Sequence, residues 1–519
     1  MKKSILCLSI LIGLGCNRQE DRLPEVISQP VVIEDDTWSF KGTQNLLFVP
    51  ENRNDPESRL LALHYFHFPA KHKSSLPPVV FLGAGPGEPY DIAAFYNGGR
   101  AEAWRYELNF VNKNRDVILI NQRGNSDAPG LQINNFRYRW KNGGTLDQPL
   151  DLGLRDKNRR ESYARHVASY TEQGIDLKGY DVLHFVDDIE AVRQHLGTDK
   201  IALVGNSFAS QWALGYIQRY PDHVDRALFS GVEPLDHNYD DPDGIWKVLE
   251  QIDHYAQQDP NIAMALPEGG LIAAFTQVME RLEAQPVKVT VADEDGEVFD
   301  IVVGADDLRF NLTYPRVRSY AAEIESWPKY IMEMYHGDFR MLALLSRGRV
   351  YNSSAFMTNP LFNNSLGVSK EREALLLKRE SRKWLGDLAN HYTATRDVCP
   401  APVVPHSFRQ HVAHDIPMVL IQGDMDMSTP YDNAVFLMDY LQNGHLLTVK
   451  RGFHNAKRAL IFADSLLIDQ VYGFMDLEDP KKGFKAYSAS IPKQYELPSF
   501  EFWPLHGPSL YDRYHSKTD

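Results

Sequence analysis

The chain has 519 residues, of which 43% are hydrophobic and 24% are charged, and its formal net charge is −14. This composition is that of a globular protein, and it excludes a membrane-embedded body, a fibrous repeat and a disordered chain. The surplus of acidic groups argues against nucleic-acid binding, because a negative surface repels phosphates. The length predicts two or three domains, or one large domain with an insertion.

The start of the chain has the pattern of a secretory signal. Lys2 and Lys3 precede an apolar run at residues 4–15, which is too short to span a bilayer. The sequence Leu-Gly-Cys at residues 14–16 resembles a bacterial lipobox, in which the cysteine is lipidated and becomes the mature N-terminus. A plain signal peptide that is cleaved nearby is the alternative.

We therefore expect an exported lipoprotein of the cell envelope that faces the periplasm or the cell surface. Residues 1–15 are the predicted signal peptide, Cys16 is the predicted lipidation site, and residues 16–36 are a predicted polar tether. The lipid anchor is the membrane contact that we expect, because no later segment is apolar for long enough to span a bilayer. Removal of Cys7 and acylation of Cys16 would leave Cys399 without a disulfide partner.

Apolar runs alternate with helical patterns along most of the chain. Apolar residues recur at helical spacing over residues 180–197, which predicts a helix that ends at Gly197. Alternating apolar residues at 60–68 predict a strand or hairpin near the start. Six short apolar runs are predicted as strands of a parallel sheet that is covered on both faces: residues 79–82, 117–120, 201–204, 225–230, 417–421 and 445–449. This order of strands and helices implies a right-handed, mostly parallel α/β sheet.

The pattern changes over residues 233–408, where helical segments dominate and one hairpin is predicted at residues 287–303. An inserted, mostly helical block within an α/β sheet is the simplest explanation. We therefore predict a core in two parts, residues 37–232 and 409–519, and a helical cap at residues 233–408.

Ser207 is the predicted nucleophile. It lies in Gly-Asn-Ser-Phe-Ala at residues 205–209, directly between a predicted strand and a predicted helix. A nucleophile elbow needs small residues two before and two after the serine, because the turn is strained and neighbouring backbone comes close. Gly205 and Ala209 meet this requirement. The alternative is a serine that caps an ordinary helix.

A serine hydroxyl needs a base to take its proton and a carboxylate to orient that base. The chain order expected after such an elbow is serine, acid, histidine. Asp426 and His454 each follow a predicted strand, so both are expected at the carboxyl ends of adjacent strands, where ligands bind in open α/β sheets. Asp424, two residues earlier, is the rival acid, and a surface-loop histidine is the alternative for His454.

Negative charge that develops on a substrate carbonyl oxygen needs backbone N–H donors already in place. One donor is expected from Phe208, which follows the nucleophile. The other is expected from Gly-Ala-Gly-Pro-Gly at residues 83–87, with Gly85 as the predicted donor. This turn lacks the Gly-Lys-Ser/Thr of a phosphate-binding loop. No cluster of His, Cys and Asp has metal-ligand spacing, so we expect neither a metal nor another cofactor.

The order of these motifs resembles that of the α/β-hydrolases in the prolyl aminopeptidase and tripeptidyl aminopeptidase group. The shared motifs are residues 83–87, Asn-Gln-Arg-Gly at 121–124, residues 205–209, residues 423–430 and Gly-Phe-His at 452–454. The resemblance implies an α/β-hydrolase fold with an inserted, mostly helical cap. It also implies a serine peptidase with Ser207 as nucleophile, Asp426 as acid and His454 as base.

An aminopeptidase must recognise a free α-ammonium group, which requires a carboxylate near the nucleophile. Glu233, after the strand at 225–230, and Glu88, after the glycine-rich turn, are the two candidates. A solvated surface carboxylate is the alternative for each. We predict a serine aminopeptidase that removes residues from peptide N-termini through an acyl-enzyme on Ser207. An esterase that acts on small acyl esters with the same three residues, and a non-catalytic surface lipoprotein that retains the fold, are the other hypotheses.

Overall fold

The computed structural model describes residues 25–92, 95–96, 98–125, 136–313, 321–386 and 388–516. The predicted signal peptide and the predicted lipidation site at Cys16 lie outside these residues. Within the described ranges, no helix is both long enough and apolar enough to cross a membrane.

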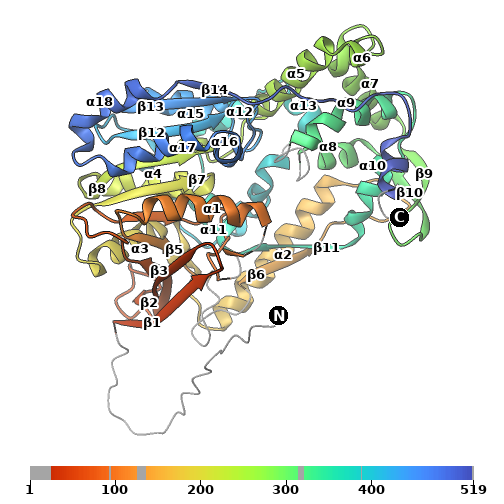
Figure 1. The fold of residues 1–519 in the computed structure, drawn as a ribbon. Coiled ribbons are helices and arrows are strands. Elements are labelled where there is room, and N and C mark those ends of the chain that lie inside the picture. The colour runs from red at the N-terminus through yellow and green to blue at the C-terminus, as the bar shows by residue number, and fades with distance from the viewer. Residues whose placement is uncertain are drawn as a thin grey trace.

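A ten-stranded sheet forms the centre of the core (Figure 1). Its strands lie in the order β1-β2-β3-β5-β4-β7-β8-β12-β13-β14. Neighbours from β1 to β5 pair antiparallel, and neighbours from β5 to β14 pair parallel. The strands are β1 (Val26–Glu34), β2 (Ser39–Pro50), β3 (Leu60–Phe68), β4 (Val79–Leu82), β5 (Val117–Ile120), β7 (Ile201–Asn206), β8 (Val224–Ser230), β12 (Met418–Gly423), β13 (Gly444–Lys450) and β14 (Gln494–Glu496).

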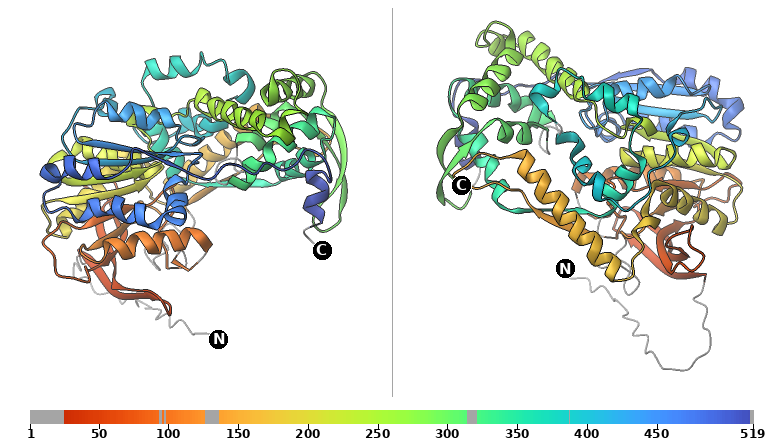
Figure 2. Two further views of the ribbon diagram at one scale, coloured as in Figure 1. Left: turned by 45° about the horizontal axis from the view of Figure 1, so that its top comes forward. Right: turned by 180° about the vertical axis from the view of Figure 1, so that it is seen from behind.

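Helices cover both faces of this sheet, which explains why β4 and β5 are buried along their whole length (Figure 2). One apolar cluster joins the sheet to α3 (Val182–His195), α4 (Phe208–Arg219) and α15 (Tyr431–Met438). The other face packs against α1 (Gly98–Val111), α16 (Ala456–Ala463), α17 (Ser465–Tyr472) and α18 (Pro480–Ser490). Short 3-10 turns complete the core: η2 (Leu177–Tyr180), η3 (Pro221–His223) and η7 (Gly473–Asp476). The predicted mostly parallel α/β sheet is confirmed, and α3 is the helix predicted at 180–197.

A second body of helices with its own apolar cluster lies beside the core (Figure 1). It begins at η4 (Leu235–His237), just after β8, and it contains the predicted hairpin as β9 (Val287–Ala292) and β10 (Val298–Val303). Its other elements are α5 (Pro242–Gln258), α6 (Pro260–Ala263), α7 (Gly270–Ala284), α8 (Ala305–Thr313), α9 (Ala321–Tyr335), α10 (Arg340–Ser346), η5 (Arg347–Val350), β11 (Asn352–Phe356), α11 (Thr358–Leu366), α12 (Lys370–Leu376), α13 (Arg382–Leu385), η6 (Leu388–Val398) and α14 (His406–Arg409). We call this body the cap.

A segment assigned to the core from the sequence reaches into the cap. β6 (Arg137–Lys141) pairs antiparallel with β11 of the cap. The long helix α2 (Leu152–Glu172) packs against β6 and η6 and extends from the core toward the cap in the rear view (Figure 2). The predicted core boundary at 37–232 is therefore corrected, because the strand partner of β6 lies in the cap.

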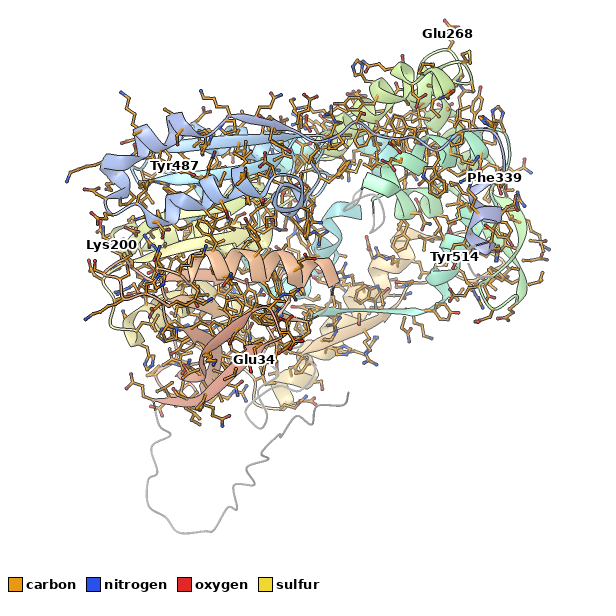
Figure 3. The ribbon with its side chains drawn as sticks, viewed as in Figure 1. Glu34, Lys200, Glu268, Phe339, Tyr487 and Tyr514 are labelled. Carbon is orange, nitrogen blue, oxygen red and sulfur yellow. The ribbon has the colours of Figure 1, made fainter. Side chains whose placement is uncertain are left out.

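The end of the chain also crosses to the cap. Tyr487 of α18 lies on the core, whereas Tyr514 of α19 (Leu510–His515) lies on the cap together with Phe339 (Figure 3). The buried Lys329 ammonium of α9 donates to the carbonyls of three tail residues, of which Pro504 is the nearest at 3.0 Å. The predicted second core segment, 409–519, is therefore too long, because its last residues form a strap across the cap.

The predicted tether at residues 16–36 is also too long. Residues 26–34 form β1, which pairs with β2 along its full length and places Ile33 in the core. Val31 and Ile33 are buried while Val32 is exposed, so the strand shows the two-residue period of a half-buried edge strand. This short alternation lies among prolines and charges, which favoured the prediction of a tether.

Candidate active site

Ser207 lies in a strained turn between β7 and α4. Its φ is 59° and its ψ is −133°, a conformation that costs a non-glycine residue about 1–3 kcal/mol. The Ser207 N–H donates to the Ser230 carbonyl at 3.0 Å, and the Ser210 hydroxyl donates to the Ser207 carbonyl at 2.7 Å. A Cβ at Gly205 would lie 2.8 Å from the Ala209 backbone. The turn therefore requires Gly205 and favours a small residue at 209, as an elbow does.

His454 and Asp426 form a hydrogen-bonded pair. His454 Nδ1 lies 3.1 Å from Asp426 Oδ1 and 3.0 Å from Oδ2. Asp426 is 1% exposed, while His454 is half-buried in the loop after β13. With Nδ1 engaged by the carboxylate, Nε2 is the ring nitrogen that is left to exchange a proton with a substrate or a nucleophile.

The protein holds the Asp426 carboxylate with four further donors. Backbone N–H groups of Ser428 and Thr429 donate to Oδ1 at 2.8 and 2.9 Å. The Thr429 hydroxyl donates to Oδ2 at 2.7 Å, and the Gln422 amide donates to Oδ2 at 3.1 Å. Burial opposes ionisation, but the adjacent His454 and the donors from Thr429 outweigh it and hold the pKa of Asp426 below its ordinary value. Asp426 is thus an ionised, oriented carboxylate.

Asp424 has different surroundings. Its Oδ2 pairs with the Lys450 ammonium at 3.1 Å, and its Oδ1 is buried and has no hydrogen-bond partner among the described residues. The Asp424 N–H donates to the Val449 carbonyl of β13. His454 therefore pairs with Asp426, whereas the rival acid faces a lysine.

Gly231 connects the serine and histidine sides of the site. A Cβ at this glycine would lie 3.2 Å from His454 Cε1 and 3.1 Å from Thr429 Oγ1, and its φ is 58°. The preceding residue, Ser230, accepts the hydrogen bond from Ser207. Consecutive residues at the end of β8 thus contact the Ser207 backbone and the His454 ring, which places the predicted nucleophile and base at one edge of the sheet.

The glycine-rich turn after β4 is held by a side chain of a second motif. Gln122 Oε1 accepts from the Gly87 N–H at 2.7 Å, and its Nε2 donates to the Ala84 carbonyl at 2.9 Å. Gly85 is exposed in this turn with a φ of 123°. Phe208 is the first residue of α4, so its N–H lies at the positive end of the helix dipole. The motif at 121–124 has no role that its sequence alone revealed, and the structure identifies Gln122 as the residue that fixes the turn.

The next residue of that motif joins the turn to the core. The Arg123 guanidinium is fully buried and donates to both carboxylate oxygens of Asp188 on α3, at 2.7 and 2.5 Å. It also donates to the carbonyls of Glu51 and Gly179. A buried charge of this kind is stable only when it is paired, and here the pairing joins β2, η2 and α3 behind the turn.

The two predicted ammonium-binding carboxylates lie in different places. Glu233 is half-buried, and its N–H donates to the Ser210 hydroxyl at 3.0 Å, one turn into the helix that Ser207 begins. Glu88 is exposed at the end of the glycine-rich turn. Among the described residues no group of three or more His, Cys, Asp and Glu side chains is arranged to hold a metal ion.

Comparison with protein families now defines the fold. The family model of the alpha/beta hydrolase fold matches residues 77–456, which span both parts of the core and the cap. The chain belongs to the α/β hydrolase fold family. No curated protein matches its sequence significantly.

Solved structures of hydrolases and related enzymes align with this α/β hydrolase over most of its length. A bromoperoxidase from Bacillus anthracis is 15% identical, with 82% of this chain and 99% of that chain covered and a TM-score of 0.31. A serine hydrolase from Cycloclasticus zankles is 13% identical, with 86% and 99% covered and a TM-score of 0.33. A haloalkane dehalogenase from Bradyrhizobium elkani is 13% identical, with 82% and 96% covered and a TM-score of 0.33. Their names describe different reactions, and likeness at this level carries no conclusion about the substrate of this chain.

Proposed function

We propose that this α/β hydrolase is a serine hydrolase with Ser207 as nucleophile, His454 as base and Asp426 as the orienting acid. The observation that carries the proposal is the strained Ser207 turn, which meets the end of β8 next to an imidazole whose Nδ1 already engages a buried carboxylate. A serine that only capped α4 would need no positive φ, and its side chain makes no capping hydrogen bond.

The geometry supports an acyl-enzyme mechanism. Ser207 Oγ attacks the substrate carbonyl carbon while His454 Nε2 takes the hydroxyl proton. The N–H groups of Phe208 and Gly85 are proposed to stabilise the oxyanion. His454 then gives its proton to the leaving amine or alcohol as the carbonyl–leaving-group bond breaks. Water hydrolyses the resulting ester on Ser207 by the same steps, and the oxygen of Ser207 regains its proton.

A fluorophosphonate probe tests this proposal directly, because it phosphonylates an activated serine. The wild-type protein is expected to be labelled on Ser207, as mapped by peptide mass spectrometry, and Ser207→Ala is expected to abolish labelling. Ser365→Ala is the matched control, since Ser365 of α11 is also a fully buried helical serine whose hydroxyl donates to a backbone carbonyl, that of Phe362. A wild-type protein that is folded and remains unlabelled would establish the non-catalytic alternative.

We further propose that the substrate is a peptide with a free N-terminus, and that Glu233 binds its α-ammonium group. The supporting observation is its backbone hydrogen bond to Ser210, which places Glu233 at the start of the helix that carries the nucleophile. Aminoacyl and N-acylated chromogenic substrates, together with simple esters, separate a peptidase from an esterase. Preference for simple esters, with no activity on free amines, would establish the esterase instead.

Glu233→Gln is expected to lower kcat/KM on free-amine substrates by about 10- to 100-fold, the loss of one hydrogen bond to a charged group. Activity on N-acylated substrates is expected to change little, because they offer no charge to this carboxylate. Glu88→Gln is the matched control on the exposed carboxylate. Equal losses on both substrate classes would show that Glu233 supports the fold rather than the substrate.

The exported location is also a proposal, supported by the sequence pattern that ends at Cys16. Mass spectrometry of the mature N-terminus is expected to find a lipid on Cys16, and Cys16→Ala is expected to release the protein from the membrane fraction. An unmodified N-terminus beyond Cys16 would contradict the anchor.

A further inference from the structure

Gln422 is a fully buried amide in β12 that the sequence analysis did not single out. Its neighbours along the strand are apolar residues of the sheet, including Leu420 and Ile421, both fully buried. A buried amide is costly unless its donors and its acceptor are hydrogen-bonded, so the partners of this side chain show what it does.

The three hydrogen bonds of Gln422 all go to the proposed catalytic edge. Its Nε2 donates to Asp426 Oδ2 at 3.1 Å and to the Thr429 carbonyl at 2.8 Å. Its Oε1 accepts from the Val232 N–H at 2.9 Å. Both amide hydrogens and the amide oxygen are therefore used.

These contacts join two segments that hold the histidine. Asp426 and Thr429 form one segment, and both contact His454 Nδ1. Val232 belongs to the other, because it follows Gly231, on which the imidazole ring rests. One side chain thus fixes the carboxylate that orients the ring and the backbone that supports its edge.

We propose that Gln422 is a positioning residue that sets the orientation of Asp426 and of the His454 ring, an inference that rests on the proposed serine hydrolase. It also joins the proposed triad acid to the segment that leads into the cap, because Val232 lies between β8 and η4. A buried glutamine suits this place because it offers two donors to oxygen atoms and one acceptor to an N–H group, without charge.

The decisive variant is Gln422→Glu, which keeps the size of the side chain and an oxygen that can accept from Val232. It removes both N–H donors and places a second carboxyl group beside Asp426. Like charges at this distance cannot both ionise freely, so the two carboxyl groups titrate as a pair. A carboxyl group offers at most one donor where the amide offered two, so Asp426 or the Thr429 carbonyl loses its hydrogen bond in this variant.

The other charged groups near this place are unchanged in the variant. Asp424 and Lys450 pair beside Asp426, and Lys247 of α5 pairs with Asp432 at the start of α15. All four line the crevice of about 200 Å³ that also borders Asp426. Any change in pH dependence is thus assigned to the substituted side chain.

The matched control is Gln251→Glu. Gln251 lies on α5 in the same crevice, and its amide donates to the Asp424 carbonyl at 3.1 Å. The control adds a carboxyl group to the crevice that borders Asp426 without removing a hydrogen bond from Asp426. Gln422→Met adds no charge and removes all three contacts.

The experiment measures kcat and KM between pH 5 and 9, fluorophosphonate labelling, thermal unfolding, and the downfield NMR resonance of the His454 Nδ1 proton. Gln422→Glu is expected to lower kcat by about 10- to 100-fold, the loss of a hydrogen bond to a charged group, with KM within about twofold. Because its two carboxyl groups titrate as a pair, the pH profile of Gln422→Glu is expected to differ from that of Gln251→Glu. Both Gln422 variants are expected to shift the Nδ1 proton resonance, and Gln251→Glu is expected to leave it in place.

A Gln422→Glu variant that behaves like Gln251→Glu overturns the inference, and so does an unshifted Nδ1 proton resonance in a folded Gln422→Met variant. If the glutamate variant does not fold, the methionine variant decides through that resonance. Failure of the proposed function is distinguishable, because it would show as a wild-type protein that the fluorophosphonate does not label.

Discussion

The nucleophile side and the acid–base side of the site pack into different apolar clusters. Phe208, Ala209 and Trp212 follow Ser207 and are buried in an apolar cluster of the core. The residues that flank the acid and the histidine, namely Met425, Met427 and Phe453, belong instead to the apolar cluster of the cap. The cap also reaches the nucleophile side, because Phe362 of α11 packs on the Phe208 ring with the two ring centroids 4.5 Å apart.

The glycine-rich turn at residues 83–87, which carries the proposed oxyanion donor Gly85 and is called the oxyanion turn below, has contacts with both the core and the cap. Gln122 holds it from the core, and Phe356 of β11 packs on it from the cap, since a Cβ at Gly87 would lie 2.4 Å from the Phe356 ring. The Arg137 guanidinium stacks on the same Phe356 ring, 4.0 Å from its centroid. We conclude that the cap contacts each part of the site by a different route: the glycine-rich turn through Phe356, the nucleophile side through Phe362, and the acid–base side through the cluster that contains Met425, Met427 and Phe453.

The largest expected effect distinguishes the two carboxylates of the loop after β12, Asp424 and Asp426. Asp426→Asn is expected to lower kcat by about 10⁴-fold, because an amide cannot hold the imidazole in the working tautomer. Asp424→Asn is expected to change kcat by less than about tenfold, since it removes an ion pair with a partly exposed lysine. Steady-state kinetics on folded variants provides the measurement. A larger loss of kcat in Asp424→Asn than in Asp426→Asn would show that the acid has been assigned wrongly.

The second effect tests the cap contact with the oxyanion turn. Phe356→Ala is expected to lower kcat by about tenfold with little change in KM, a smaller loss than removal of an oxyanion donor because the N–H groups remain. Fluorophosphonate labelling of Ser207 is expected to slow by a similar factor.

Phe299→Ala is the matched control for this prediction. Phe299 is a half-buried phenylalanine of the cap hairpin that also has an arginine, Arg347, stacked on its ring at 4.8 Å, and it lies within the apolar cluster of the cap. Its loss is expected to reduce thermal stability without a comparable loss of kcat. Equal kinetic losses in both variants would show that the cap acts through general stability.

The smallest expected effect concerns the pH dependence of folding stability at the junction between the cap and the core. His411 Nε2 accepts from the Leu235 N–H at 2.9 Å, and His237 Nδ1 lies 2.7 Å from Asn433 Oδ1 of α15. Burial, followed by the charges of neighbouring groups, lowers the pKa of His237 to about 4 and that of His411 to about 3. Both rings are therefore neutral in the folded protein at pH values where they are protonated in the unfolded chain.

Each ring has a lower pKa in the folded protein than in the unfolded chain. The neutral rings therefore stabilise the fold above about pH 6.5, and this stabilisation is lost as pH falls toward about 4. The wild-type protein is expected to lose on the order of 1–3 kcal/mol over this interval at this junction. His411→Gln keeps an acceptor for Leu235 and is expected to flatten the fall, as measured by thermal unfolding at pH 7 and pH 4.5. His336→Gln, at an exposed histidine of the cap, is the control; equal flattening by both variants would contradict the assignment to the junction.

Local sequence patterns were sufficient for the sheet and for the order of the site. The strands predicted at residues 79–82, 117–120, 201–204, 417–421 and 445–449 were predictable because a strand buried on both faces needs a continuous apolar run, and such a run is visible without any partner. The elbow at Ser207 was predictable for the same kind of reason, since close backbone contacts require small residues at Gly205 and Ala209. Asp426 and His454 followed from their places after strand ends.

Only the tertiary structure decided which partners surround each side chain of the site. Asp424 and Asp426 share one loop, and only the folded chain brings Lys450 to the first and His454 to the second. Gln422 meets the Val232 N–H across 190 residues of sequence, and nothing in its strand pattern distinguishes it from a neighbouring core residue.

The same distinction explains the corrected boundaries. β6 carries no sign of its partner, because antiparallel pairing with β11 depends on how the cap folds back on the core. The strap at the C-terminus contains several aromatic residues, and their apolar surface does not reveal which body will bury it. The sequence by itself determined the elements that satisfy their own backbone and apolar faces locally. Contacts between elements distant in the chain determined the rest, because their energy exists only when both partners are in place.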